Sequence, residues 1–123
     1  MDDRTTTQPR VVLSLKRRRI TITRKTLQMI GSPEYILLLV KPEERSLVIT
    51  PGDIMDKRTH RIPPFNSEGK KKPIELCSKL LMHSIADISS SMQYNSSYRI
   101  KGELISDENI LLFYIDKAEL LSK

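Results

Sequence analysis

The residues best suited to chemistry in this chain are cations, and the chemistry they suit is phosphate binding. Four are consecutive, Lys16 to Arg19, and they lead into the alternating segment Ile20-Thr21-Ile22-Thr23, which Arg24 and Lys25 follow. A disordered basic tail needs no such alternation, and an ordinary strand needs no such density of positive charge. The pattern therefore predicts a folded surface that binds a polyanion.

The central segment 53–73 adds a second group of cations among several turn-forming residues. A loop of this length is usually functional or without fixed structure. Two interpretations stay open: a second contact for the same polyanion, or a solvated loop. The cations predicted to bind nucleic acid or an acidic partner are Lys16, Arg17, Arg18, Arg19, Arg24, Lys25, Lys57, Arg58, Arg61, Lys70, Lys71 and Lys72.

The few residues that often perform catalysis are not arranged for it. His83 follows the single cysteine, Cys77, by six residues, which is about 240° around a helix, so the two side chains point apart. The carboxylates Glu43, Glu44, Asp107 and Glu108 fall in expected turns, and four glycines form no phosphate-binding loop. The sequence predicts a non-enzymatic protein with no metal and no cofactor.

Length and charge set the class of partner. The 123 residues fit one domain, and the net charge of +6 favours nucleic acid or an acidic protein surface. One cysteine excludes an intrachain disulfide and favours a reducing compartment. No apolar run is long enough to span a membrane and no signal peptide is recognised, so we expect a cytoplasmic protein, or a nuclear one in a eukaryote.

Hydrophobic periodicity predicts the elements that must position these cations. We expect an α+β domain with a small antiparallel sheet of two hairpins, one short helix over 24–30 and one longer amphipathic helix over 74–88. A short helix is also expected at 116–122. Residues 1–10 are expected to form a flexible arm, and residues 11–123 a single domain with a basic loop at 53–73.

The run Tyr35-Ile36-Leu37-Leu38-Leu39-Val40 bears on oligomeric state. A strand without alternation is typical of burial on both faces. Six consecutive apolar residues in a short domain need such cover, and a dimer with shared strands would supply it. Such a run is more often part of a domain core than of an interface, so both interpretations stay open, and the run is the feature that favours a homodimer.

Residues 19–50 resemble the AbrB/MazE-type swapped-hairpin domain. The matching features are the strand Arg19-Ile20-Thr21-Ile22, a short basic helix ending in Ile30-Gly31, and the hairpin expected over Tyr35–Thr50. The resemblance implies a dimeric DNA-binding regulator or antitoxin, whose DNA-facing cations match Arg19, Arg24 and Lys25. The chain departs from the family at Thr23, where a proline is usual, and at Pro33-Glu34, where Gly-Asp is usual.

Two functions of different classes follow from these features. The first is a small DNA-binding transcriptional regulator, with DNA favoured over RNA because few aromatic residues are present for base stacking. The alternative is an adaptor or inhibitor encoded by a mobile element, of the anti-restriction or anti-CRISPR type. Such a protein would use the same cations to bind an acidic protein surface or a nucleoprotein complex.

Overall fold

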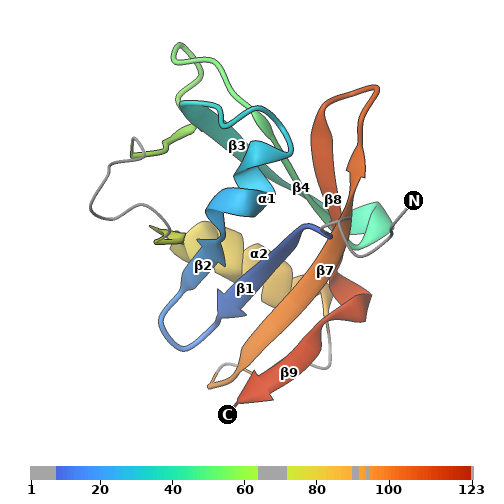
Figure 1. Ribbon diagram of the computed structural model, residues 1–123. Coiled ribbons are helices and arrows are strands. Elements are labelled where there is room, and N and C mark those ends of the chain that lie inside the picture. The colour runs from blue at the N-terminus through green and yellow to red at the C-terminus, as the bar shows by residue number, and fades with distance from the viewer. Residues whose placement is uncertain (1–7, 64–71, 90–91, 94, 123) are drawn as a thin grey trace.

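The computed structural model describes residues 8–63, 72–89, 92–93 and 95–122 of the chain, in which strands form one sheet (Figure 1). The strands are β1 (Arg10–Ser14), β2 (Arg19–Ile22), β3 (Tyr35–Lys41), β4 (Ser46–Pro51), β5 (His60–Arg61), β6 (Ile74–Cys77), β7 (Ser97–Ile105), β8 (Ile110–Tyr114) and β9 (Glu119–Ser122). The helices are α1 (Arg24–Gln28) and α2 (Lys79–Ile88), with the 3-10 turns η2 (Pro42–Glu44) and η3 (Ile115–Lys117).

The sheet contradicts the expected fold class. Its order is β5-β3-β4-β8-β7-β1-β2-β6, with β9 added to β7, and it curls into a nearly closed, barrel-like form. The expectation of an α+β domain built on a small sheet of two hairpins is therefore wrong. Local periodicity identified hairpins, but strands from opposite ends of the chain also pair, as β1 does with β7. Such pairing joins the hairpins into one larger sheet.

Local signals were reliable where a hairpin or a helix cap decides the structure. β3 pairs with β4 and β7 with β8, as the expected hairpins require, whereas the pairing of β1 with β2 is seen only in the structure. Thr23 caps α1 by accepting a hydrogen bond from the backbone N–H of Thr26 at 3.2 Å. Gly31 adopts a φ of 89°, a left-handed conformation that ends the helical segment at little steric cost.

The longer helix begins later than its periodicity predicts. Ile74 is buried and Glu75 exposed, and the segment pairs with β2 as strand β6. Ser78 then caps α2 by accepting a hydrogen bond from the N–H of Leu81 at 3.1 Å. The first four residues of the expected helix are extended because β2 offers them a ladder of backbone hydrogen bonds.

The expected helix over 116–122 is also wrong. The 3-10 turn η3 covers Ile115–Lys117, and strand β9 follows it. β9 pairs with the beginning of β7, whose later residues pair with β8. After β8, the chain therefore pairs again with β7, at the opposite end of that strand. This long-range pairing overrides the local helical pattern.

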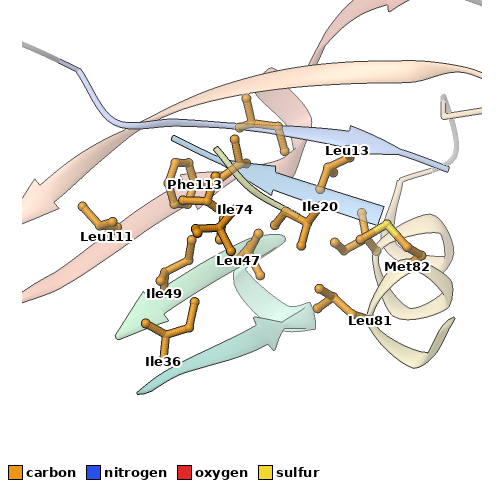
Figure 2. Packing of buried hydrophobic residues seen from close by; sticks show 14 of the residues in the cluster. Leu13, Ile20, Ile36, Leu47, Ile49, Ile74, Leu81, Met82, Leu111 and Phe113 are labelled. Atoms are coloured by element: carbon orange, nitrogen blue, oxygen red, sulfur yellow. The ribbon is translucent and has the colours of Figure 1, made fainter. Parts of the chain in front are cut away.

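The core fills the interior of the curled sheet. Fully buried side chains come from both halves of the chain, among them Leu13, Ile20, Leu47, Leu111 and Phe113. Figure 2 shows them converging, with Leu81 and Met82 of α2 closing one side. α2 thus lies against the inner face of the sheet, and the opposite, outward side chains remain available for partners.

One side chain links the two ends of the strand order. Arg24 of α1 donates hydrogen bonds to the carbonyl of Pro63, after β5, at 2.9 Å and to that of Lys72, before β6, at 3.3 Å. The intervening residues 64–71 lie outside the described residues, as do residues 1–7 of the expected arm. Of that arm, Pro9 accepts a hydrogen bond from Gly102 N–H at 2.8 Å, so its end joins the fold.

Candidate nucleic-acid interface

The cations Lys16, Arg17 and Arg18 lie in the tight turn between β1 and β2, and all three side chains are exposed. Arg18 adopts a φ of 55° and donates its backbone N–H to the carbonyl of Leu15 at 3.3 Å. The sequence prediction of a folded basic segment is confirmed in this respect. The run is a hairpin turn that directs its charges outward.

Hydrogen bonds to two other parts of the fold hold this turn in place. The N–H of Leu15 donates to the carbonyl of Ser96 at 3.1 Å, and the carbonyl of Arg18 accepts from the N–H of Ser78 at 3.1 Å. Leu15 itself is buried in the core. A turn anchored in this way loses little backbone entropy when a ligand binds its side chains.

The Arg19 side chain forms an ion pair within the chain. Its Nη1 lies 3.0 Å from Oε1 of Glu75 on the neighbouring strand β6. Its Nε is buried and has no hydrogen-bond partner among the described residues. Since the Arg19 side chain is only 32% exposed, it contributes less free charge than the three cations of the turn.

Further cations lie on the same outward side of the sheet, and sequence reasoning missed them. Arg10 of β1 is directly opposite Lys101 of β7, and Val12 is opposite Arg99. Arg99 forms an ion pair with Glu119 of β9 at 3.2 Å. We call this surface the basic face, defined by Arg10, Lys16, Arg17, Arg19, Arg99 and Lys101.

The basic face contains a shallow cavity of about 330 Å³ beside the turn. Lys16, Arg17 and Arg19 line it together with Glu75, Asn95 and small polar residues. A groove lined by cations and hydroxyl groups suits phosphate oxygens. Among the described outward residues of β1, β2 and β7 there is no aromatic side chain, so the face offers no platform for base stacking.

The remaining predicted cations are not part of the basic face. The Arg24 side chain donates hydrogen bonds to backbone carbonyls, while Lys25 is exposed on α1. Lys72 lies at the edge of the segment that the structure describes, and Lys70 and Lys71 lie outside it. β2 separates Arg24 from the basic turn by a length of roughly 13 Å.

A second cavity, of about 500 Å³, gathers some of these other residues. Arg24, Gln28, Glu34 and Arg61 line it, together with Ile62 and prolines. Arg61 and Glu34 are 3.8 Å apart across it. The cavity unites the two side chains that suit base reading, Arg24 and Gln28, but Arg24 is already hydrogen-bonded to the main chain.

Lys57 and Arg58 lie in the loop between β4 and β5, which is at the far end of the molecule from the basic turn in Figure 1. Asp56 accepts bonds from the Arg58 side chain, at 2.8 and 3.1 Å, and from its backbone N–H at 2.9 Å. These bonds lower the pKa of Asp56 to about 2, the side-chain bond contributing most. The loop is thus ordered by its own polar contacts.

This ordered loop presents two apolar side chains at its tip. Ile54 is 64% exposed and Met55 is 83% exposed. The N–H of Met55 donates to Oδ1 of Asp53 at 2.9 Å, which fixes the turn that carries both residues. Rigid, exposed apolar residues are unusual on a small soluble surface and suit contact with a protein.

A different surface lies on the outward side of β3, β4 and β8. Leu39, Val48 and Leu112 are opposite one another across the three strands, and Leu37 extends the row along β3. Val48 is 4% exposed at the centre, while the leucines around it are half-buried. We call these four residues the apolar face.

The described residues contain no group of three or more His, Cys, Asp or Glu side chains placed to hold a metal ion. Within the same residues, no helix has the length and apolar character needed to cross a membrane. No protein-family model, no curated protein and no solved structure matches the chain. The proposals below therefore rest on the chain's own geometry.

Proposed function

We propose that this protein is a non-enzymatic DNA-binding protein, of the kind that regulates transcription, and that it contacts the DNA backbone through its basic face. The observation that carries the proposal is the clustering of six cations on three adjacent strands and one anchored turn. Among the described residues, Arg19 and Arg99 are the members of this set that form ion pairs, with Glu75 and Glu119. Its site of action would be the cytoplasm, or the nucleus in a eukaryote.

Duplex DNA fits this face better than single-stranded RNA. Proteins that bind single strands stack bases on aromatic side chains, whereas duplex contacts are mainly from cations and hydroxyls to phosphates. The outward residues of β1, β2 and β7 are of the second kind, with Ser14, Thr21 and Ser97 between the cations. The resemblance of residues 19–50 to AbrB/MazE-type domains supports the same class of ligand.

Binding to unrelated duplex DNA at 50 and 200 mM salt tests the proposal. A face that contacts several phosphates gives micromolar or tighter binding at low salt, which weakens steeply as salt rises. The variant Lys16→Ala/Arg17→Ala removes two exposed turn cations without touching the core. Absence of binding by the unmodified protein at 50 mM salt would exclude the function.

A second candidate is an adaptor or inhibitor that binds an acidic protein surface or a nucleoprotein complex. The specific observation in its favour is the rigid tip Ile54-Met55, which is flanked by Lys57 and Arg58. An apolar anchor with a basic rim is complementary to an apolar pocket with an acidic rim. Inhibition of a restriction or CRISPR nuclease that Met55→Asp abolishes, and Lys41→Asp does not, would favour this candidate.

We also propose that the protein is a homodimer that buries the apolar face. The four residues of the face are uncharged, with Glu103 of β7 opposite Leu112 at one end of the row, and a second copy presents the same apolar row for them to pack against. The leucines at 37, 39 and 112 are half-buried, so they still expose apolar surface that a dimer contact would remove from water. Light scattering over a range of protein concentrations measures the mass directly.

A further inference from the structure

A third cavity, separate from the two described above, lies between the basic turn and α2. Its volume is about 400 Å³. The turn contributes Lys16 and Arg18 to its lining, and α2 contributes Lys79 and His83. Figure 1 shows the β1–β2 hairpin beside α2, which explains how residues distant in sequence meet here.

The floor of this cavity is apolar and its rim is basic. Leu15 and Met82 form the floor, at 5% and 3% exposure, and belong to the core. Lys16, Arg18, Lys79 and His83 are all exposed. No carboxylate lines the cavity among the described residues, although Oδ2 of Asp87 lies 3.9 Å from Nε2 of His83 at its rim.

The two sides of the rim are joined by a main-chain hydrogen bond. The carbonyl of Arg18 accepts from the N–H of Ser78, the residue that caps α2 and precedes Lys79. The left-handed conformation of Arg18 is held by this bond and by its own bond to Leu15. The positive charges are therefore brought together by the fold before any ligand arrives, which lowers the cost of binding.

The cavity is continuous in its lining with the basic face. Lys16 and Asn95 line both this cavity and the shallow one on that face. A strand whose phosphates follow the basic face would therefore reach this cavity at the turn. Its basic side chains come from two sides, the turn and α2, so it suits a phosphate at the end of a strand, which has three free oxygens, better than a phosphate within a strand, which has two.

We infer that this cavity binds a terminal phosphate group, the phosphomonoester at the end of a nucleic-acid strand held on the basic face. The inference rests on the proposed DNA-binding function. A monoester carries close to two negative charges at neutral pH, against one for a diester, and so gains more from the three cations Lys16, Arg18 and Lys79, with His83 as a further hydrogen-bonding group.

Paired oligonucleotide duplexes that differ only in a 5′-phosphate or 5′-hydroxyl end test the inference. The unmodified protein should bind the 5′-phosphorylated duplex about tenfold more tightly, a ratio that corresponds to 1.4 kcal/mol. In Lys79→Ala/His83→Ala the two affinities should become equal, at the value of the 5′-hydroxyl duplex. Lys101→Ala, on the basic face, should weaken both ligands by the same factor and preserve the ratio.

Two results would overturn the inference. Equal affinity of the unmodified protein for both duplexes would exclude an end-binding site while leaving DNA binding intact. An amide NMR titration in which inorganic phosphate shifts Lys79 and His83, without any preference for the phosphorylated end, would show that free phosphate is the ligand instead. If neither duplex binds at all, the DNA-binding function itself fails. Because Lys79 and His83 are exposed, thermal melting should show that the double variant is folded.

Discussion

The two outward surfaces of the sheet differ in chemistry although the inward surfaces are alike. Along β1 and β7 the outward residues include Arg10, Arg99 and Lys101, whereas the row across β3, β4 and β8 is Leu39, Val48 and Leu112. Most inward residues on both sides are buried aliphatics, joined by Phe113 on β8 and Tyr98 on β7. The comparison shows that the inward residues of each strand form a common core. The outward residues differ between the two sides and determine which kind of partner each side can bind.

The largest expected effect comes from a change at the junction of the two surfaces. Gly102 lies on β7 where pairing with β1 gives way to pairing with β8. A Cβ there would lie 2.5 Å from the Phe113 ring and would also strike the carbonyl of Leu112. Gly102→Ala should lower the free energy of unfolding by about 3 kcal/mol, through overpacking. Urea unfolding measures it, with the outward neighbour Glu103→Ala as the matched control.

A loss of under 1 kcal/mol in Gly102→Ala would mean that β7 and β8 adjust to the added methyl group. The close approach of Phe113 to β7 would then not be a fixed part of the junction between the two surfaces. The control should remain within about 0.5 kcal/mol of the unmodified protein, since exposed substitutions rarely exceed that value.

The next effect separates the basic face from the rest of the positive charge. Arg10→Ala/Arg99→Ala/Lys101→Ala should reduce the slope of log affinity against log salt by about 2.7, because each lost phosphate contact contributes about 0.9. The control Lys25→Ala/Lys41→Ala/Lys57→Ala removes equal charge elsewhere. DNA titrations at several salt concentrations measure both slopes. Equal losses in the two variants would mean that net charge, and not this face, attracts DNA.

A smaller effect is expected on the apolar face. Leu39→Asp should weaken self-association at least tenfold, because a desolvated carboxylate opposite Val48 is costly at an apolar contact. DNA contacts of the basic face should be preserved in the monomer. Sedimentation at increasing protein concentration measures the association, with Lys41→Asp as the control. If the unmodified protein remains monomeric at high concentration, the proposal that the apolar face forms a homodimer is wrong.

The smallest effect is local and depends on pH. The folded pKa of Asp56 is about 2, below its ordinary value of 3.8, so its contribution to loop order is complete above pH 4 and is lost as pH falls towards 2. The protection factors of the Arg58 and Thr59 amides, relative to the intrinsic exchange rate at each pH, should fall over that range, and Asp56→Ala should lower them at neutral pH. Exchange rates that ignore both changes would show that the tip Ile54-Met55 is held by other contacts.

Sequence patterns located the elements that depend on neighbours along the chain. The alternation after the basic run predicted β2, the hairpin expected over Tyr35–Thr50 is formed by β3 and β4, and the short helix expected over 24–30 is α1, which ends at Gln28. The patterns failed where long-range pairing decides, as in Ile74–Cys77, which pairs with β2, and in Glu119–Ser122, which pairs with β7. In both segments a helical pattern gave way to an available strand edge.

The candidate site was predictable to a similar extent. Consecutive cations at 16–18 are visible in one dimension, and the structure places them on an exposed turn. Arg10, Arg99 and Lys79 join them only through the β1–β7 register and the Arg18–Ser78 bond, which the sequence does not reveal. For the part of the basic face on β7, the available signal was the alternation of Arg99 and Lys101 with Tyr98 and Ile100.

The position of β7 has a consequence for how this protein can be dissected. Its first five residues pair with β1, which begins at Arg10, and its last four pair with β8, so one continuous strand serves both surfaces. The molecule cannot be divided into independent parts. A fragment that lacks the N-terminal or the C-terminal region loses a strand that pairs with β7. Since β7 serves both surfaces, such a fragment would lose both the charged and the apolar surface. Deletion mapping would report every activity as requiring the whole chain, and only single substitutions can assign an activity to one side.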